Sequence, residues 1–344
     1  MFFCLFASCK VVLGSSRSTI CDIERGKVYF IPNELAGLLN EGFIAQKLIP
    51  LQFKDWIEEF VSSELGFWTQ NPEYFPKISL DWDSPELINN AILEMDFHTM
   101  EDIEAMITQL NGLHCKFVEF RYYHKFEVEK FAKILPLLTQ GTIRGFTIFL
   151  PFHSLNGIES LSSIYDNTVQ LQSIIIHSAP KDLKGIEKHE KVLVTDSKID
   201  STHHCGKVSP DYFSINISTF TESQSYNTCL NRKISVDLKG NIKNCPSTSK
   251  VFGNIKSDSL IEIAKDRSFQ KLWHISKDQV NVCKSCEFRY VCTDCRAYLE
   301  NPDDIFSKPL KCGYNPETTE WQEWSVNPIK SQSIKYYKLD QQVK

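Results

Sequence analysis

The sequence predicts a mixed α/β protein that ends in a cysteine-rich region. Three observations support this prediction. Residues 1–70 have the pattern of a small β-then-α unit, and residues 75–200 alternate strand-like and helix-like segments. Seven of the twelve cysteines fall between Cys229 and Cys312. Strands separated by helices are typical of βα units, which build a parallel sheet or a partial barrel.

The first 70 residues predict short strands followed by two helices. Apolar residues 9–13 and 19–22 are joined by a Gly-Ser-rich turn, and a second turn leads to the apolar segment 28–31. Pro32-Asn33 then opens a helix to Leu39, and residues 52–65 carry apolar side chains at helical spacing. The apolar start, residues 1–13, lacks the positive charge of a secretory signal and is predicted to form a strand.

The middle of the chain predicts five strands and four helices in alternation. The expected strands are residues 78–82, 116–120, 146–150, 173–177 and 192–195. The expected helices begin at Ser84-Pro85, follow the stripe from Ile103 to Leu110, and cover residues 127–138 and 157–167.

Beyond residue 200 turns multiply and helices become sparse. Alternation around Ile234 and Val236 before Lys239-Gly240-Asn241 predicts a hairpin, and one helix is expected at residues 258–273. The expected domain boundaries are therefore 1–70, 75–200, 201–315 and a polar tail at 316–344.

Composition excludes several classes of protein. A net charge of −5 and a pI near 6.0 argue against a nucleic-acid-binding surface. No apolar run reaches the length of a membrane span, so no membrane partner is expected. Without an export signal the chain is expected in the cytoplasm, where thiols bind metal more often than they form disulfides.

The cysteines follow a metal-ligand spacing. Cys229 and Cys245 flank Gly240, and Cys283-x2-Cys286 and Cys292-x2-Cys295 precede a lone Cys312. A Cys-x2-Cys pair lets one tight turn aim two thiolates at one metal centre, and soft thiolates select zinc or iron–sulfur clusters. A zinc ribbon uses four ligands, whereas this array offers seven or eight, enough for two Cys4 clusters. Zinc remains the alternative.

This array, together with Phe252-Gly253-Asn254-Ile255 and Cys312-Gly313-Tyr314, is similar to the SPASM domain of peptide-modifying radical enzymes. One departure is that two residues, Thr293 and Asp294, stand where relatives commonly have three. The resemblance implies two auxiliary 4Fe–4S clusters. The ligands it implies for one cluster are Cys283, Cys286, Cys292 and Cys312. For the other they are Cys229, Cys245 and Cys295, with Cys205 as the candidate fourth ligand and His203 or His204 as alternatives.

Basic residues flank these cysteines. Lys284, Arg289 and Arg296 either offset the charge of a cluster or are ordinary exposed cations, and the sequence leaves both interpretations open.

The motif that binds S-adenosylmethionine in radical enzymes is absent. That motif is a Cys-x3-Cys-x2-Cys loop after the first barrel strand, whereas here no cysteine lies between Cys21 and Cys115, and Cys115 stands alone. S-adenosylmethionine is therefore not an expected cofactor. A barrel-like middle can persist as a scaffold without that loop. No catalytic residue is assigned, and whether the chain is itself an enzyme stays open.

The whole chain resembles the SPASM-domain peptide maturase of grasp-with-spasm systems, which implies an ATP-grasp ligase and a precursor peptide as partners. The segment with Arg17-Ser18 and Tyr29-Phe30-Ile31-Pro32-Asn33 resembles a winged-helix RiPP recognition element, which binds a leader peptide as an added strand. The expected peptide-binding residues are Val28, Tyr29, Phe30, Ile31 and Leu35, although they could simply pack a small core. The alternatives are a radical enzyme with atypical cluster ligands and a zinc-ribbon adaptor.

Overall fold

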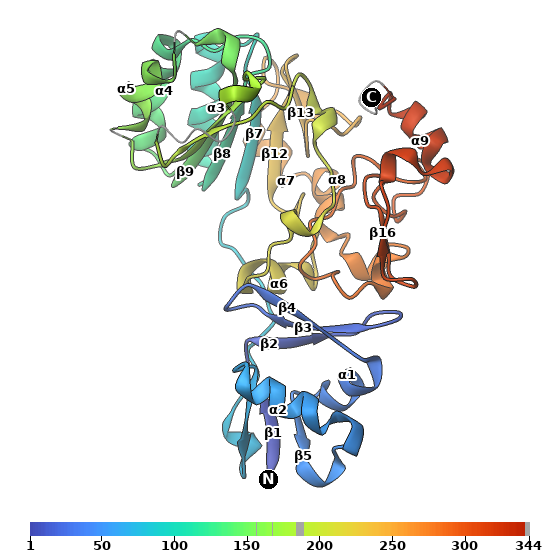
Figure 1. The fold of residues 1–344 in the computed structure, drawn as a ribbon. Coiled ribbons are helices and arrows are strands. Elements are labelled where there is room, and N and C mark those ends of the chain that lie inside the picture. The colour runs from blue at the N-terminus through green and yellow to red at the C-terminus, as the bar shows by residue number, and fades with distance from the viewer. Residues whose placement is uncertain (156, 167, 184–188, 341–344) are drawn as a thin grey trace. The chain divides into compact units, whose positions relative to one another are not determined.

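The computed structural model describes residues 1–155, 157–166, 168–183 and 189–340. The fold is mixed α/β, as predicted, with a mostly parallel eight-stranded sheet (Figure 1). The chain forms two compact units, and each unit is built from segments that are not contiguous in the sequence. The first unit comprises Met1–Asp83, Gly206–Cys229 and His274–Lys344, and the second comprises Ser84–Cys205 and Leu230–Trp273.

The first unit contains two small antiparallel sheets from the N-terminal segment. One has the order β5-β1-β6 and the other the order β2-β3-β4. Their strands are β1 (Phe2–Leu5), β2 (Cys9–Val12), β3 (Ser18–Asp22), β4 (Lys27–Ile31), β5 (Phe43–Ala45) and β6 (Gly66–Thr69). Helices α1 (Asn33–Leu39) and α2 (Lys54–Ser62) lie where the sequence predicts them. The predicted strand over residues 1–13 is two strands, because the chain turns at Ala7-Ser8 and enters a different sheet.

The β2-β3-β4 sheet is buried on both faces, which explains why every residue of β3 is buried. Ile20 and Ile31 pack with α1 and α2 in one apolar core. Val12 and Cys21 pack in a second core that contains Cys292 and Cys312. The β2-β3-β4 sheet therefore packs against the N-terminal helices on one face and against the cysteine-rich loops on the other.

The rest of the first unit is poor in regular structure. It contains α6 (Ile217–Ser223), the short strands β15 (Tyr314–Asn315) and β16 (Glu320–Trp321), and α9 (Ser331–Tyr336). An Asn216 side chain caps α6 by accepting a hydrogen bond from the Thr219 N–H.

The second unit is built around the large sheet, in the order β11-β10-β9-β8-β7-β12-β13-β14. Strands β7 to β11 follow one another along the sheet in parallel, with α-helices between successive strands from β7 to β10, which is the progression of a partial (β/α) barrel. Figure 1 shows α3 and α4 together beside these strands. The strands are β7 (Asn90–Glu94), β8 (Phe117–Arg121), β9 (Gly145–Pro151), β10 (Leu171–His177), β11 (Val192–Val194), β12 (Lys233–Val236), β13 (Asn241–Lys243) and β14 (Gly253–Asn254). The helices are α3 (Met100–Gly112), α4 (Val128–Thr139), α5 (Ser162–Tyr165), α7 (Leu260–Lys265) and α8 (Arg267–Gln270).

Two predictions at the start of the sheet are wrong. Residues 78–82 form no strand, and no helix begins at Ser84-Pro85; the first strand of the sheet is β7. The Ser84 hydroxyl lies within hydrogen-bond distance of two acceptors, Glu86 Oε2 (2.6 Å) and Asn89 Oδ1 (2.9 Å). Such local side-chain bonds compete with regular structure.

Two predicted helices are shorter than expected. The expected helix at 258–273 is interrupted at Asp266, whose carboxylate accepts a hydrogen bond from the Ser268 N–H (2.6 Å) and starts α8. The helix expected at 157–167 is a 3₁₀ turn, Ile158–Leu161, followed by α5, and residue 167 lies outside the described residues. The predicted hairpin is confirmed by the pairing of β12 with β13, and Gly240 supplies the positive φ of 79° that the turn requires.

Among the helices that the structure describes, none is long and apolar enough to cross a membrane.

The buried His177 at the end of β10 predicts a loss of stability in acid. Its Nε2 lies 3.0 Å from the Tyr122 carbonyl oxygen, and burial lowers the pKa of the imidazole below its usual 6.5. The unfolded chain therefore binds a proton below about pH 6.5 that the folded chain does not bind, so stability falls as the pH falls below that value. The fall is at most about 1.4 kcal/mol per pH unit. We expect His177→Gln to reduce the difference in melting temperature between pH 7.5 and 5.5. An unchanged difference would contradict this prediction.

Candidate metal centre

Four of the predicted metal ligands lie together in the first unit. Cys283 begins a 3₁₀ turn, Cys283–Ser285, and the Cys286 N–H donates to the Cys283 carbonyl (2.9 Å), which closes the Cys-x2-Cys turn. Cys292 and Cys312 share the second apolar core, against which Cys286 packs. The thiol of Cys283 interacts electrostatically with those of Cys292 and Cys312, and that of Cys286 interacts with Cys283 and Cys292.

These four thiols are buried or half-buried, and none of them forms a disulfide. Cys283, Cys292 and Cys312 are buried, Cys286 is half-buried, and all twelve cysteines lie among the described residues and form no disulfide. Val282, directly before Cys283, has a φ of 67°, which is rare for a β-branched residue. Backbone strain of this kind persists where the surrounding structure fixes it, often at functional sites.

The thiols do not converge on one point. Within the described residues, no group of three or more His, Cys, Asp or Glu side chains is arranged to hold a single metal ion. A 4Fe–4S cluster binds each thiolate through a different iron, so its four ligands stand apart around a larger body. A dispersed set of buried thiols is compatible with such a cluster.

A buried network of charges faces the thiols. The Lys277 ammonium lies 3.6 Å from Cys292 Sγ and 4.0 Å from Cys283 Sγ, and 3.2 Å from Asp294 Oδ1. Arg296 donates from Nη2 to the same carboxylate oxygen (2.7 Å). All three charged residues are at most 5% exposed. Two cations against one carboxylate leave a net positive charge beside the sulfurs.

The ionisation of this network follows from burial and from its charges. Burial alone would lower the pKa of Lys277, but the nearby Cys283, Cys292 and Asp294 charges raise it well above its ordinary value. Burial opposes ionisation of Asp294, yet Lys277 and Arg296 hold its pKa below the usual value. Burial raises the pKa of the Cys292 thiol to about 12, against the influence of Lys277. Removing protons from such thiols requires a cation that takes their place, as a metal does.

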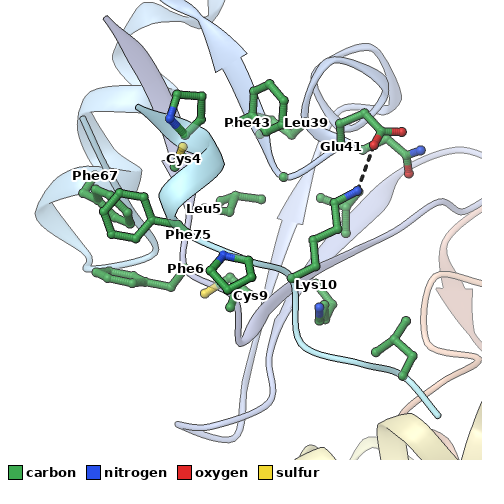
Figure 2. A pocket seen from close by; sticks show the side chains of 18 of the residues that line it. Cys4, Leu5, Phe6, Cys9, Lys10, Leu39, Glu41, Phe43, Phe67 and Phe75 are labelled. Carbon is green, nitrogen blue, oxygen red and sulfur yellow. Dashed lines mark hydrogen bonds and ion pairs between the residues drawn. The ribbon is translucent and has the colours of Figure 1, made fainter. Parts of the chain in front are cut away.

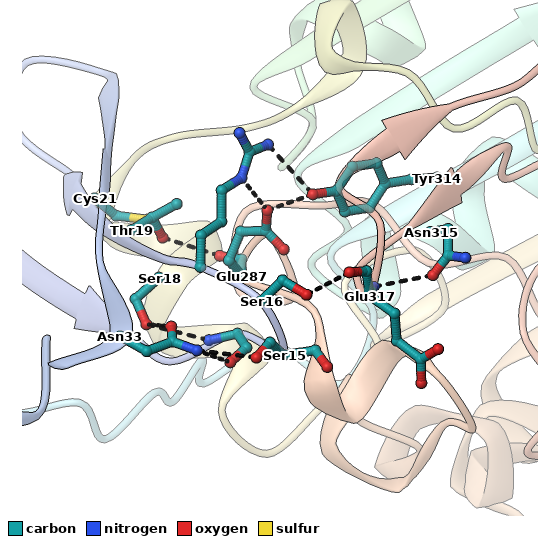
Figure 3. Close-up of polar contacts among 12 residues, drawn as sticks. Ser15, Ser16, Ser18, Thr19, Cys21, Asn33, Glu287, Tyr314, Asn315 and Glu317 are labelled. Carbon is teal, nitrogen blue, oxygen red and sulfur yellow. Dashed lines mark hydrogen bonds and ion pairs between the residues drawn. The ribbon is translucent and has the colours of Figure 1, made fainter.

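The loop that carries Cys286 is attached to the N-terminal sheet. Figure 3 shows the Glu287 carboxylate between Tyr314 and a guanidinium, which is that of Arg17. Arg17 Nε donates to Glu287 Oε1 (2.8 Å), and the Tyr314 hydroxyl donates to the same oxygen. The Thr19 hydroxyl donates to the Glu287 carbonyl (3.0 Å), and the Ser15 N–H donates to the Ser285 carbonyl (2.8 Å).

The other predicted ligands are divided between the two units. Cys229 and Cys295 belong to the first unit, and Cys205 and Cys245 to the second. Cys295 is buried, and a side chain at Gly206, which has a φ of 81°, would approach Cys295 Sγ to 2.9 Å. Arg121 Nη1 donates to Cys205 Sγ (3.3 Å). His203 and His204 lie in the 3₁₀ turn before Cys205. The ligand sets of both clusters, and the number of clusters, stay predictions.

The predicted peptide-binding residues have different environments. Ile31 and Leu35 are buried in the N-terminal core, whereas Val28 and Tyr29 are half-buried and Phe30 is 44% exposed. The rings of Phe30 and Phe288 meet edge to face, with centroids 5.8 Å apart. The Arg17 guanidinium lies 3.7 Å from the centroid of the Phe30 ring. Their role in binding a peptide stays a prediction.

Sequence reasoning missed two parts of the site. Lys277 and Asp294 had no signal, because a lysine six residues before Cys283 and an aspartate in a loop have the composition of an exposed surface. Of the three flanking cations, Lys284 is exposed and Arg289 forms an ion pair with Asp278 (3.0 Å), while only Arg296 is buried among the cysteines.

Comparison with known families identifies part of this region. Residues 228–287 match the model of the SPASM family, an iron-sulfur cluster-binding domain. The match includes Cys229, Cys245, Cys283 and Cys286 and ends before the last three cysteines of the array. The SPASM segment contributes residues to both units. The match therefore places a segment similar to an iron–sulfur cluster-binding domain within the cysteine-rich region.

Solved structures of Streptococcus suis SuiB are similar over most of the chain. SuiB bound to S-adenosylmethionine is 9% identical, with a TM-score of 0.31, over 89% of this chain and 98% of SuiB. SuiB bound to the precursor peptide SuiA is 10% identical, with a TM-score of 0.30, over 96% of this chain and 100% of SuiB. These values are too low to carry a function from SuiB to this chain. No curated protein matches the chain.

Proposed function

We propose that this chain is a SPASM-domain component of ribosomal peptide maturation. It holds two 4Fe–4S clusters, binds the leader of a precursor peptide, and acts with an ATP-grasp ligase. The observation that carries the proposal is the buried Lys277 ammonium within 4.0 Å of the sulfurs of Cys283 and Cys292, in a chain whose residues 228–287 match the SPASM family.

The residues of the first unit fit a cluster chemically. Cys283, Cys286, Cys292 and Cys312 supply the four soft thiolates that a Cys4 cluster requires. Lys277 points its ammonium at two of the sulfurs and offsets their negative charge. When bound, such a cluster supplies either one-electron transfer or a cross-link that stabilises the fold.

A cluster for S-adenosylmethionine is not part of the proposal. The strand that opens the parallel sheet is β7, and the loop after it, residues 95–99, contains no cysteine. The nearest cysteine that follows, Cys115, is buried before β8, where burial raises the pKa of its thiol to about 12. The first strand is β7 rather than residues 78–82, and neither segment is followed by a Cys-x3-Cys-x2-Cys loop.

The leader is proposed to add to the edge of β4. Among the described residues β4 pairs with β3 alone, so its second edge has no strand partner. Phe30 on β4 contacts Phe288, which lies two residues beyond Cys286. A peptide strand on this edge would therefore lie next to the loop that holds Cys286. This proximity supports one protein that both binds the leader and holds the cluster.

Removal of the Phe30 ring is expected to weaken leader binding about tenfold, because an exposed aromatic anchor on the strand edge is lost. The measurement is titration calorimetry of full-length Phe30→Ala with the precursor encoded beside its gene. Phe97→Ala is the control, since Phe97 is 68% exposed and lies in the other unit. Wild-type protein that does not bind the precursor would remove the peptide half of the proposal.

The ligase partnership has its own test. The chain, the precursor and the neighbouring ATP-grasp ligase are expected to elute together in size-exclusion chromatography. Elution of the ligase and precursor without this chain would contradict the partnership.

A further inference from the structure

The first unit contains a cavity of about 910 Å³ that the proposed function does not use. Figure 2 shows its wall, formed by the turn between β1 and β2, the end of α1 with the start of β5, and the segment after β6. Its volume is in the range of pockets that bind small molecules or short peptide segments.

Aromatic rings form the apolar part of the wall. Phe6, Phe43 and Phe75 line the cavity and are 38%, 42% and 51% exposed. Phe67 packs between Phe6 and Phe75, with ring centroids 5.1 Å and 4.6 Å away. Single exposed apolar residues are common on proteins, but several exposed rings around one cavity mark a surface for binding.

Two lysines, Lys10 and Lys77, line this cavity. Lys77 forms an ion pair with Glu41 (2.8 Å), and the exposed Glu73 also lines the cavity. The half-buried Lys10 ammonium forms no ion pair or hydrogen bond with any residue that the structure describes. Burial lowers the pKa of Lys10, and the charge of Lys77 lowers it further. A partly buried ammonium beside aromatic rings would be stabilised by a carboxylate.

The strand that carries Lys10 has one edge without a strand partner, on which the Cys9 N–H already donates to the Phe6 carbonyl (2.8 Å). Three of the four residues of β2, namely Cys9, Lys10 and Val11, line the cavity. In the described sheets β2 pairs with β3 alone, at the opposite end of the sheet from β4. An unpaired strand edge presents backbone N–H and C=O groups, to which an extended peptide adds. This edge favours a peptide over a compact small molecule.

We propose that this cavity binds an extended peptide segment along β2, with an acidic side chain on Lys10 and apolar side chains against Phe6, Phe43 and Phe75. This inference rests on the peptide-binding part of the proposed function and adds a second binding edge, β2, on the same sheet. It does not depend on the metal.

The test uses full-length protein and a phage-displayed library of random octapeptides. Enriched peptides are expected to carry Asp or Glu flanked by aromatic or branched apolar residues. Lys10→Met should weaken the best synthetic peptide about tenfold, the effect of one charge-assisted contact. Lys10→Arg should keep the affinity, and Lys47→Met, an exposed lysine outside the cavity, is the matched control. Exchange of the peptide carboxylate for an amide should cost the same factor and add nothing to Lys10→Met.

The outcomes separate this inference from the rest of the proposal. A library without enrichment, or enriched peptides that bind Lys10→Met and wild type equally, overturns the inference. If Phe30→Ala abolishes binding while Lys10→Met does not, the peptide uses β4; the cavity inference then fails and the leader proposal stands. If purified protein contains no iron but still binds the peptide, the metal-binding part of the proposed function fails and the peptide-binding part stands.

Discussion

Asp294→Asn is expected to destabilise the first unit by about 3–5 kcal/mol, the cost of breaking a buried ion pair from one side. The substitution keeps the size of the side chain but removes the charge that holds Lys277 and Arg296 together, at 3.2 and 2.6 Å. Both cations would remain buried without a carboxylate between them. The measurement is urea unfolding under anaerobic conditions, followed by near-UV circular dichroism.

Asp278→Asn is the matched control for this prediction. Asp278 forms its ion pair with Arg289 at a comparable distance, 3.0 Å, but its side chain is 42% exposed. Water screens such a pair, so its loss should cost less than about 1 kcal/mol. Equal midpoints for the two variants would show that the network around Asp294 is not a buried charge centre.

Removal of iron is expected to loosen the first unit and leave the parallel sheet of the second unit folded. Metal binding contributes directly to folding free energy when its ligands come from loops, as Cys283, Cys286 and Cys292 do. The same core includes Val12 and Cys21 of the N-terminal sheet, so strands β2 and β3 should loosen as well. Strands β7 to β9 belong to the other unit and bury their own apolar residues.

Hydrogen exchange with mass spectrometry measures this difference along the chain. After anaerobic treatment with a chelator, protection should fall at least about tenfold in peptides from residues 9–31 and 274–315. Peptides from residues 90–150 should be unchanged. Uniform loss of protection in both units, or no loss in either, would contradict a metal centre that stabilises the first unit.

Much of the second unit could be predicted from local patterns. Apolar runs at β8, β9, β10 and β11, separated by helical stripes, are sufficient to predict a parallel sheet because both signals are local. The prediction failed at residues 78–86, which form neither the expected strand nor the start of a helix, and where the Ser84 side chain bonds to Glu86 and Asn89. It also failed at Asp266, where one cap divides a helix that apolar spacing alone would continue.

The site could be predicted only in part. The Cys-x2-Cys spacing identifies thiols that one turn brings together, as at Cys283 and Cys286. The charges around them come from contacts that spacing does not encode: Arg17 and Glu287 are 270 residues apart and form an ion pair. Asp294 occupies the short gap in which this chain departs from the usual SPASM spacing.

Iron and acid-labile sulfide, quantified in protein purified without oxygen, test the central claim most directly. Wild-type protein is expected to contain about eight of each per chain and to be brown. Cys283→Ser should retain about four, since one Cys4 site is lost, whereas Cys115→Ser, at a buried cysteine of the second unit, should retain all eight. Folded, colourless wild-type protein with zinc or no metal would contradict the account.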